Sequence, residues 1–290
     1  MQEQTQFGMS VEKAYEYCKG VAKRNDTNFY LGFMFLPREK RNAVFAAYAF
    51  CRYADDIADE YDEADLPLLI DRWERDLELC YAGRPNHPIT IALADAVAKY
   101  GIPKSAFREL IDGCRMDQMK KRYRTFAELL EYCEKVAVTI STISLHIFGF
   151  KDPRALEYGR NLALALQLTN IIRDVGEDAR KGRIYLPLDE LERFGCTEQE
   201  LLNGVMSDRF REMMKFQVER ARSYYRGAQG LIDTLSEDCR FTTLLMGAAY
   251  AKVLEQVERN GYDVFTRRAR LNPLAKPWLL FTLILKPRFG

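Results

Sequence analysis

The chain has 290 residues, of which 48% are hydrophobic, and 43 Lys and Arg stand against 42 Asp and Glu for a formal net charge of +1. This balance excludes a general nucleic-acid binder, which needs a basic excess. No repeat or linker-like stretch divides the chain, so the sequence predicts one domain over residues 1–290. Seven scattered cysteines without a CxxC pair indicate buried thiols, and no stretch is long and apolar enough for a signal peptide or membrane span, which predicts a cytoplasmic protein.

Apolar residues recur at helical spacing along almost the whole chain, whereas the alternation typical of strands is scarce. The predicted fold class is therefore all-α. Thr197 followed by Glu200 is a capping-box pair, and Asp152 before a proline is a second helix-start signal. In chain order, the predicted helices cover 10–24, 38–60, 66–82, 88–100, 104–118, 126–148, 153–178, 188–194, 198–204, 208–234 and 237–260.

The first acidic cluster ends the predicted helix 38–60, which is apolar around much of its circumference, as central helices of a bundle are. Asp55 and Asp59 lie four residues apart and share one face, with Asp56 beside them. Like charges at this spacing destabilise a helix by about 0.2–0.5 kcal/mol. Their presence on an apolar helix therefore calls for a compensating interaction.

The second acidic cluster is a polar stripe on the predicted helix 153–178. Its members are spaced by three, four and four residues, which places them on one helix face: Gln167, Asn170, Asp174 and Asp178. The opposite side of the same helix is apolar and consists of Leu164, Leu168, Ile171, Ile172 and Val175. Because core residues border the stripe, we expect it to line a cavity.

Two DxxxD pairs facing each other across a bundle suit magnesium, which takes one or two carboxylates and completes its shell with water and phosphate oxygens. Neither pair includes the His or Cys expected of zinc, and His87 and His146 have no metal-ligand spacing, so both are predicted to be structural. An isolated DxxxD is more typical of a solvated helix face. Two such pairs, flanked by Arg52 and Arg173, favour a metal site.

The segments YAFCRYADDIAD and QLTNIIRDVGEDARKGRIYLP closely resemble the two motifs of the squalene/phytoene synthase family. DQMKKRYRTFAELLEYCEKVA and the earlier NFYLGFMFLPREKRNAVFAAYAFCR are also similar to this family, so the likeness spans about residues 20 to 260. The resemblance implies a single-domain helical bundle of the isoprenoid-synthase type with a central apolar cavity. It also implies a magnesium-dependent prenyltransferase that joins two allylic isoprenyl diphosphates head to head.

The resemblance further implies roles for individual residues. The expected magnesium ligands are Asp55, Asp59, Asn170, Asp174 and Asp178. The expected catalytic residues are the four aspartates of this set together with Tyr48, Arg52, Tyr132 and Tyr250. The residues expected to bind substrate are Phe29, Arg52, Gln167, Asn170, Arg173, Arg183 and Tyr185.

Two departures from the family pattern bear on the substrate. Val138 and Ser141 occupy positions where many relatives have glycine, and larger side chains shorten the chain that a cavity holds. Asn28 resembles the hopanoid-associated squalene synthases. These features favour two farnesyl diphosphates, joined through presqualene diphosphate towards squalene or a related C30 product. The second motif looks more like the phytoene type, so two geranylgeranyl diphosphates are the alternative. The sequence does not show whether NADPH supplies a hydride.

Other interpretations remain open at this level. Head-to-tail prenyl synthases usually carry DDxxD in both motifs, which this chain lacks in the second, and a non-catalytic assembly role is disfavoured by intact carboxylates at all four positions. The apolar stretch 277–285, flanked by basic residues, fits a last core helix or a peripheral contact with the inner face of a membrane. The sequence leaves the oligomeric state open.

Overall fold

The computed structural model describes residues 8–25, 27–60 and 65–270, without the side chains at 25, 27–29 and 58–60. Its contacts group the chain into two compact units, each built from several stretches. The first unit runs to Gln118 and adds Thr139–Asp152 and Leu235–Thr242. The second takes Met119–Val138, Pro153–Thr234 and the described residues 243–270. One domain over 1–290 stays a prediction.

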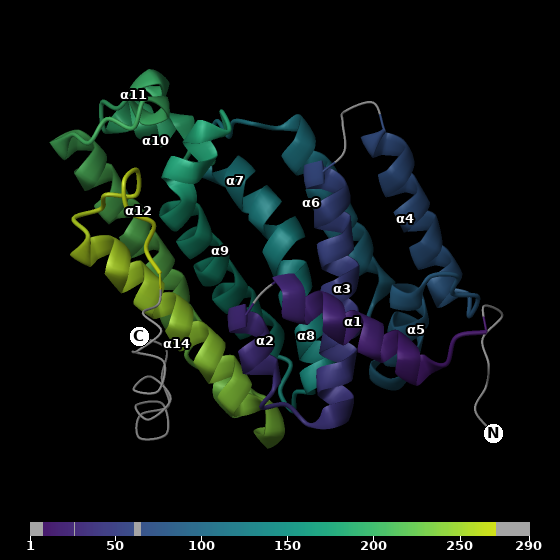
Figure 1. Cartoon of the computed structure of the whole chain (residues 1–290). Helices are drawn as coiled ribbons and strands as arrows, with labels where there is room; N and C mark the ends of the chain where they lie inside the picture. Colours follow the sequence, from purple (N-terminus) through teal and green to yellow (C-terminus); the bar gives the residue numbers. More distant parts are fainter. Residues whose placement is uncertain (1–7, 26, 61–64, 271–290) are drawn as a thin grey trace. The chain divides into compact units, whose positions relative to one another are not determined.

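Helices account for all regular elements of the described residues, which form no strand and only two isolated bridges, so the all-α prediction is confirmed. The first unit contains α1 (Val11–Asn25), α2 (Thr27–Phe33), α3 (Arg38–Glu60), α4 (Leu66–Tyr81), α5 (Pro88–Tyr100), α6 (Lys104–Met119) and α8 (Thr139–Phe148) (Figure 1). The second contains α7 (Phe126–Cys133), the π-helix η1 (Glu134–Val138), α9 (Ala155–Arg180), α10 (Leu188–Arg193), α11 (Glu198–Leu202), α12 (Asp208–Gly227), α13 (Leu231–Thr234) and most of α14 (Glu237–Arg259).

Aromatic packing around α3 forms the centre of the first unit. Helices α1, α3 and α5 pack against one another. Phe50 of α3 is fully buried; its ring stacks on Trp73 of α4 at 4.7 Å and meets Phe107 of α6 edge-on at 5.1 Å. Large buried aromatic side chains dominate core energetics, so these contacts determine which face of α3 is buried. The acidic motif lies at the C-terminal end of the same helix.

His87 is the N-cap of α5, in keeping with its predicted structural role. Its Nδ1 accepts a hydrogen bond from the backbone N–H of Ile89 at 3.2 Å, and its ring meets Trp73 edge-on at 5.3 Å. Burial lowers the pKa of His87 below its usual 6.5. The neutral ring is therefore the form that caps the helix.

This cap predicts a pH effect on stability. Because the pKa of His87 is lower in the folded protein than the ordinary 6.5, the unfolded chain takes up the proton first, and stability is lost as the pH falls below about 6.5. His87→Asn keeps a capping side chain but does not titrate. We expect the unfolding midpoint of wild type to fall more steeply than that of His87→Asn between pH 7.5 and 5.5; equal slopes would contradict this account.

The centre of the second unit is α9, which lies along α12 (Figure 1). Thr169 of α9 donates to the carbonyl of Ala165 at 2.7 Å, and its hydroxyl lies 3.1 Å from that of Tyr225 on α12. The apolar residues predicted to face the core are all buried: Leu164, Leu168, Ile171, Ile172 and Val175. The prediction of a central helix with one polar stripe is therefore confirmed.

Several predicted helix boundaries were wrong. The predicted helix 126–148 is interrupted by the π-helical turn Glu134–Val138, since hydrophobic periodicity does not reveal one extra residue in a turn. The predicted helix 208–234 ends as α12 at Gly227, and α13 follows it. Helix α2, Thr27–Phe33, was not predicted because seven residues are too few to establish a period.

The two capping signals had different outcomes. At Thr197, both halves of the box form: its hydroxyl accepts from Glu200 N at 3.1 Å, and Glu200 Oε2 accepts from Thr197 N at 2.8 Å. The start predicted at Asp152 was wrong, because α9 begins at Ala155 and no side chain caps it. The turn residues Pro153 and Arg154 separate Asp152 from the helix.

All seven cysteines are free thiols and buried, as predicted. In the part of the chain that the structure describes, no helix has both the length and the apolar character needed to cross a membrane. The stretch 277–285, predicted to pack on the core or contact a membrane, lies outside the described residues.

Candidate active site

The first acidic motif lies in the last turns of α3. Arg52 NH2 forms an ion pair with Asp56 Oδ1 at 2.5 Å, while Asp55 is exposed. The Nε of Arg52 is buried and has no hydrogen-bond partner among the described residues. Tyr48, one turn earlier, lies within electrostatic range of Arg52. Within the described part of the chain, the Arg52 guanidinium therefore keeps one unused donor beside the carboxylates.

Two predicted site residues are placed only by their helices. Asp59 lies on α3 one turn after Asp55, and Phe29 lies on α2. The side chains of both are outside the described residues. Their predicted roles in metal and substrate binding stay predictions.

Cys114 is a neighbour of the first motif that sequence reasoning missed. Its Sγ donates to Asp55 Oδ1 at 3.4 Å, from a buried position on α6. Burial and the neighbouring carboxylate raise the pKa of the Cys114 thiol above its usual value, which keeps it protonated. No sequence signal joins a cysteine to an aspartate 59 residues away.

The polar stripe of the second motif has the predicted geometry. Gln167, Asn170, Asp174 and Asp178 lie on α9 and are all half-buried. The Oδ1 of Asn170 is buried and has no hydrogen-bond partner among the described residues. Since a buried amide oxygen normally has a partner, this atom is a candidate metal ligand.

Asp174 lies between two arginines. Arg173 donates from Nε to Asp174 Oδ1 at 2.8 Å and from NH2 to Oδ2 at 2.5 Å, and Arg268 Nε donates to Oδ1 at 3.0 Å. Arg268 Nε also lies 3.3 Å from Glu177 Oε1. Tyr250 of α14 is within electrostatic range of Arg173. Both carboxylate oxygens of Asp174 are therefore held in place by guanidinium groups.

Gly176 brings Arg268 to this motif. A Cβ at Gly176 would lie 2.4 Å from the carbonyl oxygen of Val264 and 2.9 Å from the Cα of Phe265, so only glycine allows the segment after α14 to cross α9 here. Asp263 Oδ1 accepts from the backbone N–H of Phe265 at 3.2 Å and of Thr266 at 3.0 Å, which shapes the same segment. Arg268 lies two residues after Thr266, so the path of this segment places it beside Asp174.

Three tyrosines form a cluster in the second unit. The ring of Tyr185 stacks on Tyr132 with centroids 5.5 Å apart and on Tyr123 at 5.7 Å, while Tyr123 and Tyr132 lie 5.5 Å apart. Backbone hydrogen bonds join the segment that carries Tyr123 to the segment that carries Tyr185: Ile184 N donates to Lys121 O, and Leu188 N donates to Tyr123 O. The predicted residues Tyr132 and Tyr185 are thus brought together, and Tyr123 is a third member that sequence reasoning missed.

A pocket in the second unit brings three predicted residues together. Its lining consists of Asp178, Arg183 and Tyr185 together with Ile184 and other apolar side chains. The empty volume is about 180 Å³, part of which is open to solvent. A carboxylate, a guanidinium and a phenol in one pocket, at the end of the α9 stripe, form a polar set suited to a phosphate and its metal ion.

The donors of both motifs fit magnesium by their chemistry. Among the described side chains, no group of three or more His, Cys, Asp or Glu lies close enough to hold a metal ion. On α9, the carboxylates share their helix face with the amide oxygen Asn170 Oδ1, which is also a suitable magnesium ligand. Magnesium needs few protein ligands, because phosphate and water complete its coordination shell. The predicted residues therefore suit an ion that arrives with a diphosphate.

Relatives of known activity resemble the chain over most of its length. It is 41% identical over 273 residues to 15-cis-phytoene synthase from Synechococcus elongatus, covering 90% of this chain and 89% of the relative. It is 42% identical to 15-cis-phytoene synthase from Synechocystis, covering 90% and 81%. A solved dehydrosqualene synthase superposes with a TM-score of 0.87 at 30% identity, over 95% of this chain and 96% of the other. A squalene synthase from Alicyclobacillus acidocaldarius superposes at 0.83 and 29%, over 87% and 96%.

The likeness to the solved synthases confirms the isoprenoid-synthase type of the all-α fold. The family model for squalene/phytoene synthase matches residues 5–275, which include both acidic motifs and the segment that carries Arg268. The family resemblance seen in the two motifs is thereby confirmed across almost the whole chain. The chain belongs to the squalene/phytoene synthase family and is a prenyltransferase that joins isoprenyl diphosphates head to head.

Proposed function

We propose that the protein is a phytoene synthase, which joins two geranylgeranyl diphosphates head to head to form a C40 product. The observation that carries this proposal is the name of its relatives: those at 41–42% identity are phytoene synthases, whereas the solved C30 synthases are 29–30% identical. The preference for two farnesyl diphosphates, based on Val138, Ser141 and Asn28, is the less favoured alternative. A hopanoid role depends on that preference and is likewise the less favoured alternative.

We propose that magnesium binds at both motifs, through Asp55 and Asp59 on α3 and through Asn170, Asp174 and Asp178 on α9. The ion supplies positive charge that stabilises the departing diphosphate. Three features support this role: exposed Asp55, the half-buried stripe on α9, and Asn170 Oδ1, which has no hydrogen-bond partner in the described part of the chain.

The arginines have a separate task in this proposal. Arg52 and Arg183 bind diphosphate oxygens, for which a guanidinium fork is well shaped. The Nε of Arg52, which has no partner among the residues that the structure describes, is one such donor. Arg173 orients the carboxylate of Asp174 through two hydrogen bonds. Gln167, one turn before Asn170, extends the polar stripe towards the substrate.

The tyrosines have a role in carbocation chemistry. Tyr132 and Tyr185 present stacked rings whose faces attract positive charge, and Tyr48 and Tyr250 lie near the arginines of the two motifs. The apolar side chains that line the pocket beside Tyr185, such as Ile184 and Leu186, limit capture of the cation by water. The reaction to phytoene ends with loss of a proton, so this proposal requires no NADPH.

The test is to incubate the purified protein with magnesium and geranylgeranyl diphosphate, without NADPH, and to identify products by mass spectrometry. We expect phytoene, and we expect EDTA to abolish it. Phytoene formed at an undiminished rate in EDTA would refute the magnesium assignment. The absence of product with either geranylgeranyl or farnesyl diphosphate would favour the non-catalytic alternative.

A further inference from the structure

Helix α6 has two neighbouring faces with different tasks. One face is apolar and buried at helical spacing, and consists of Phe107, Leu110, Ile111 and Cys114. Phe107 meets Phe50 of α3 edge-on at 5.1 Å, and Cys114, two turns later on the same face, donates to Asp55. The buried face of α6 therefore follows α3 to the first acidic motif.

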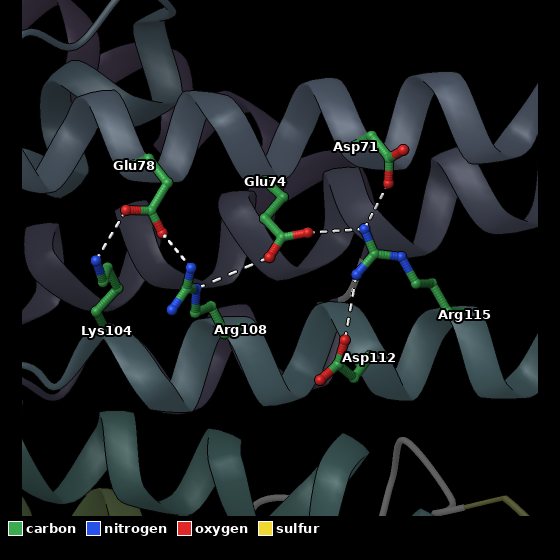
Figure 2. Close-up of polar contacts among 7 residues, drawn as sticks. All are labelled: Asp71, Glu74, Glu78, Lys104, Arg108, Asp112 and Arg115. Carbon is green, nitrogen blue, oxygen red and sulfur yellow. Dashed lines mark hydrogen bonds and ion pairs between the residues drawn. The ribbon is translucent and has the colours of Figure 1, made fainter.

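The other face of α6 is charged and is joined to α4 by a ladder of ion pairs. Figure 2 shows its members: Asp71, Glu74 and Glu78 on α4, and Lys104, Arg108, Asp112 and Arg115 on α6. Arg115 NH2 lies 2.7 Å from both Asp71 Oδ1 and Glu74 Oε2, and Arg115 NH1 lies 3.2 Å from Asp112 Oδ1. Glu78 pairs with Lys104 at 2.8 Å and with Arg108 at 3.0 Å.

The ladder fixes the register of α6. A single exposed ion pair contributes only about 0–1 kcal/mol, but this ladder connects both ends of α6 to α4. A slide of α6 by one turn, about 5.4 Å, would move its basic residues away from their present partners on α4. Arg115 is the last rung and the direct neighbour of Cys114, so the ladder ends where the thiol meets Asp55.

We propose that Cys114 is a positioning residue for Asp55: its thiol donates to one carboxylate oxygen and holds the carboxylate in the orientation that binds magnesium. The inference rests on the proposed function, in which Asp55 is a metal ligand. An exposed aspartate rotates freely unless a neighbour restrains it, and fixing it beforehand reduces the entropy lost on metal binding. A neutral donor has the further advantage that it adds no cation to compete with the metal.

Residues that hydrogen-bond to ligating carboxylates typically change metal affinity 10–100-fold when they are replaced. The test measures the midpoint of thermal unfolding against magnesium concentration, at a fixed concentration of inorganic diphosphate. In Cys114→Ala, the magnesium concentration that gives half of the stabilisation is expected to rise about tenfold. In Cys114→Ser, it is expected to stay close to wild type, because the hydroxyl keeps a donor.

Cys80→Ala is the matched control. Cys80 is another buried thiol of the first unit and donates at the same distance, 3.4 Å, but to the carbonyl of Thr90 on α5. It is expected to lower the midpoint without magnesium much as Cys114→Ala does, and to leave the half-stabilising magnesium concentration unchanged. A structural role alone would make the two alanine variants equal in both measurements.

The outcomes separate this inference from the proposed function. If Asp55→Asn weakens magnesium binding while Cys114→Ala does not, the positioning role is refuted and the metal site stands. If Asp55→Asn binds magnesium like wild type, or wild type shows no magnesium-dependent shift, both are refuted. A tenfold weakening in Cys114→Ala, reversed in Cys114→Ser and absent in Cys80→Ala, establishes the role.

Discussion

Asp174→Asn is expected to lower turnover at least about 100-fold while the protein stays folded. Asparagine keeps the volume of the side chain but removes the charge that a magnesium ion needs. We expect the fold to stay intact, because the asparagine oxygen can still accept a hydrogen bond from Arg173 or Arg268, which donate to Asp174 at 2.8 and 3.0 Å. Steady-state turnover with magnesium and geranylgeranyl diphosphate, beside the unfolding midpoint, measures the effect.

Glu177→Gln is the matched control for this substitution. Glu177 lies on the same helix and pairs with the same Arg268, at 3.3 Å, but it is not part of the polar stripe. It is expected to change stability slightly and to keep turnover within about threefold of wild type. Equal activity in Asp174→Asn and wild type, or equal loss in both variants, would contradict the assignment of Asp174 as a metal ligand.

Gly176→Ala is expected to lower the free energy of unfolding by about 1–3 kcal/mol. The new Cβ would lie 2.4 Å from the carbonyl oxygen of Val264, and since this neighbour is backbone, the crossing segment itself must move. This cost exceeds the gain of roughly 0.5–1 kcal/mol that alanine brings to a helix interior. The displaced segment also carries Arg268 away from Asp174, so the variant is expected to lose activity as well.

Gly20→Ala separates the clash from the general effect of alanine in a helix. Gly20 lies within α1, and its Cβ would have as nearest neighbour only the Arg24 guanidinium at 3.4 Å. We expect it to stabilise the protein by up to about 1 kcal/mol. Urea unfolding measures both variants. A Gly176→Ala protein as stable as Gly20→Ala would show that the segment does not cross α9 as closely as described.

The parts of the fold that could be predicted are those set by hydrophobic periodicity. The bounds predicted for α3 and α5, 38–60 and 88–100, are those of the structure, since long apolar patterns identify a helix without knowledge of its partners. The stripe from Gln167 to Asp178 followed from spacing alone, because residues three and four apart share a helix face. The local sequence pattern was sufficient to predict a feature wherever that feature lies within a single helix.

The parts that could not be predicted depend on contacts between distant segments. Arg268 reaches Asp174 across 94 residues of sequence, and Cys114 reaches Asp55 across 59. The glycine inside the helical run DVGED was the one available signal, because glycine in a helix interior often marks a close approach by another segment. The π-helical turn at Val138 also escaped prediction, and it lies in the segment where this chain departs from many relatives.

The most direct test of the central claim is a comparison of kcat/KM for geranylgeranyl and farnesyl diphosphate on the same purified protein, with magnesium, with and without NADPH. The proposed function predicts a higher value for the C20 substrate, phytoene as product, and no effect of NADPH. A higher value for the C15 substrate, with presqualene diphosphate, squalene or hydroxysqualene as product, would contradict it and restore the C30 assignment.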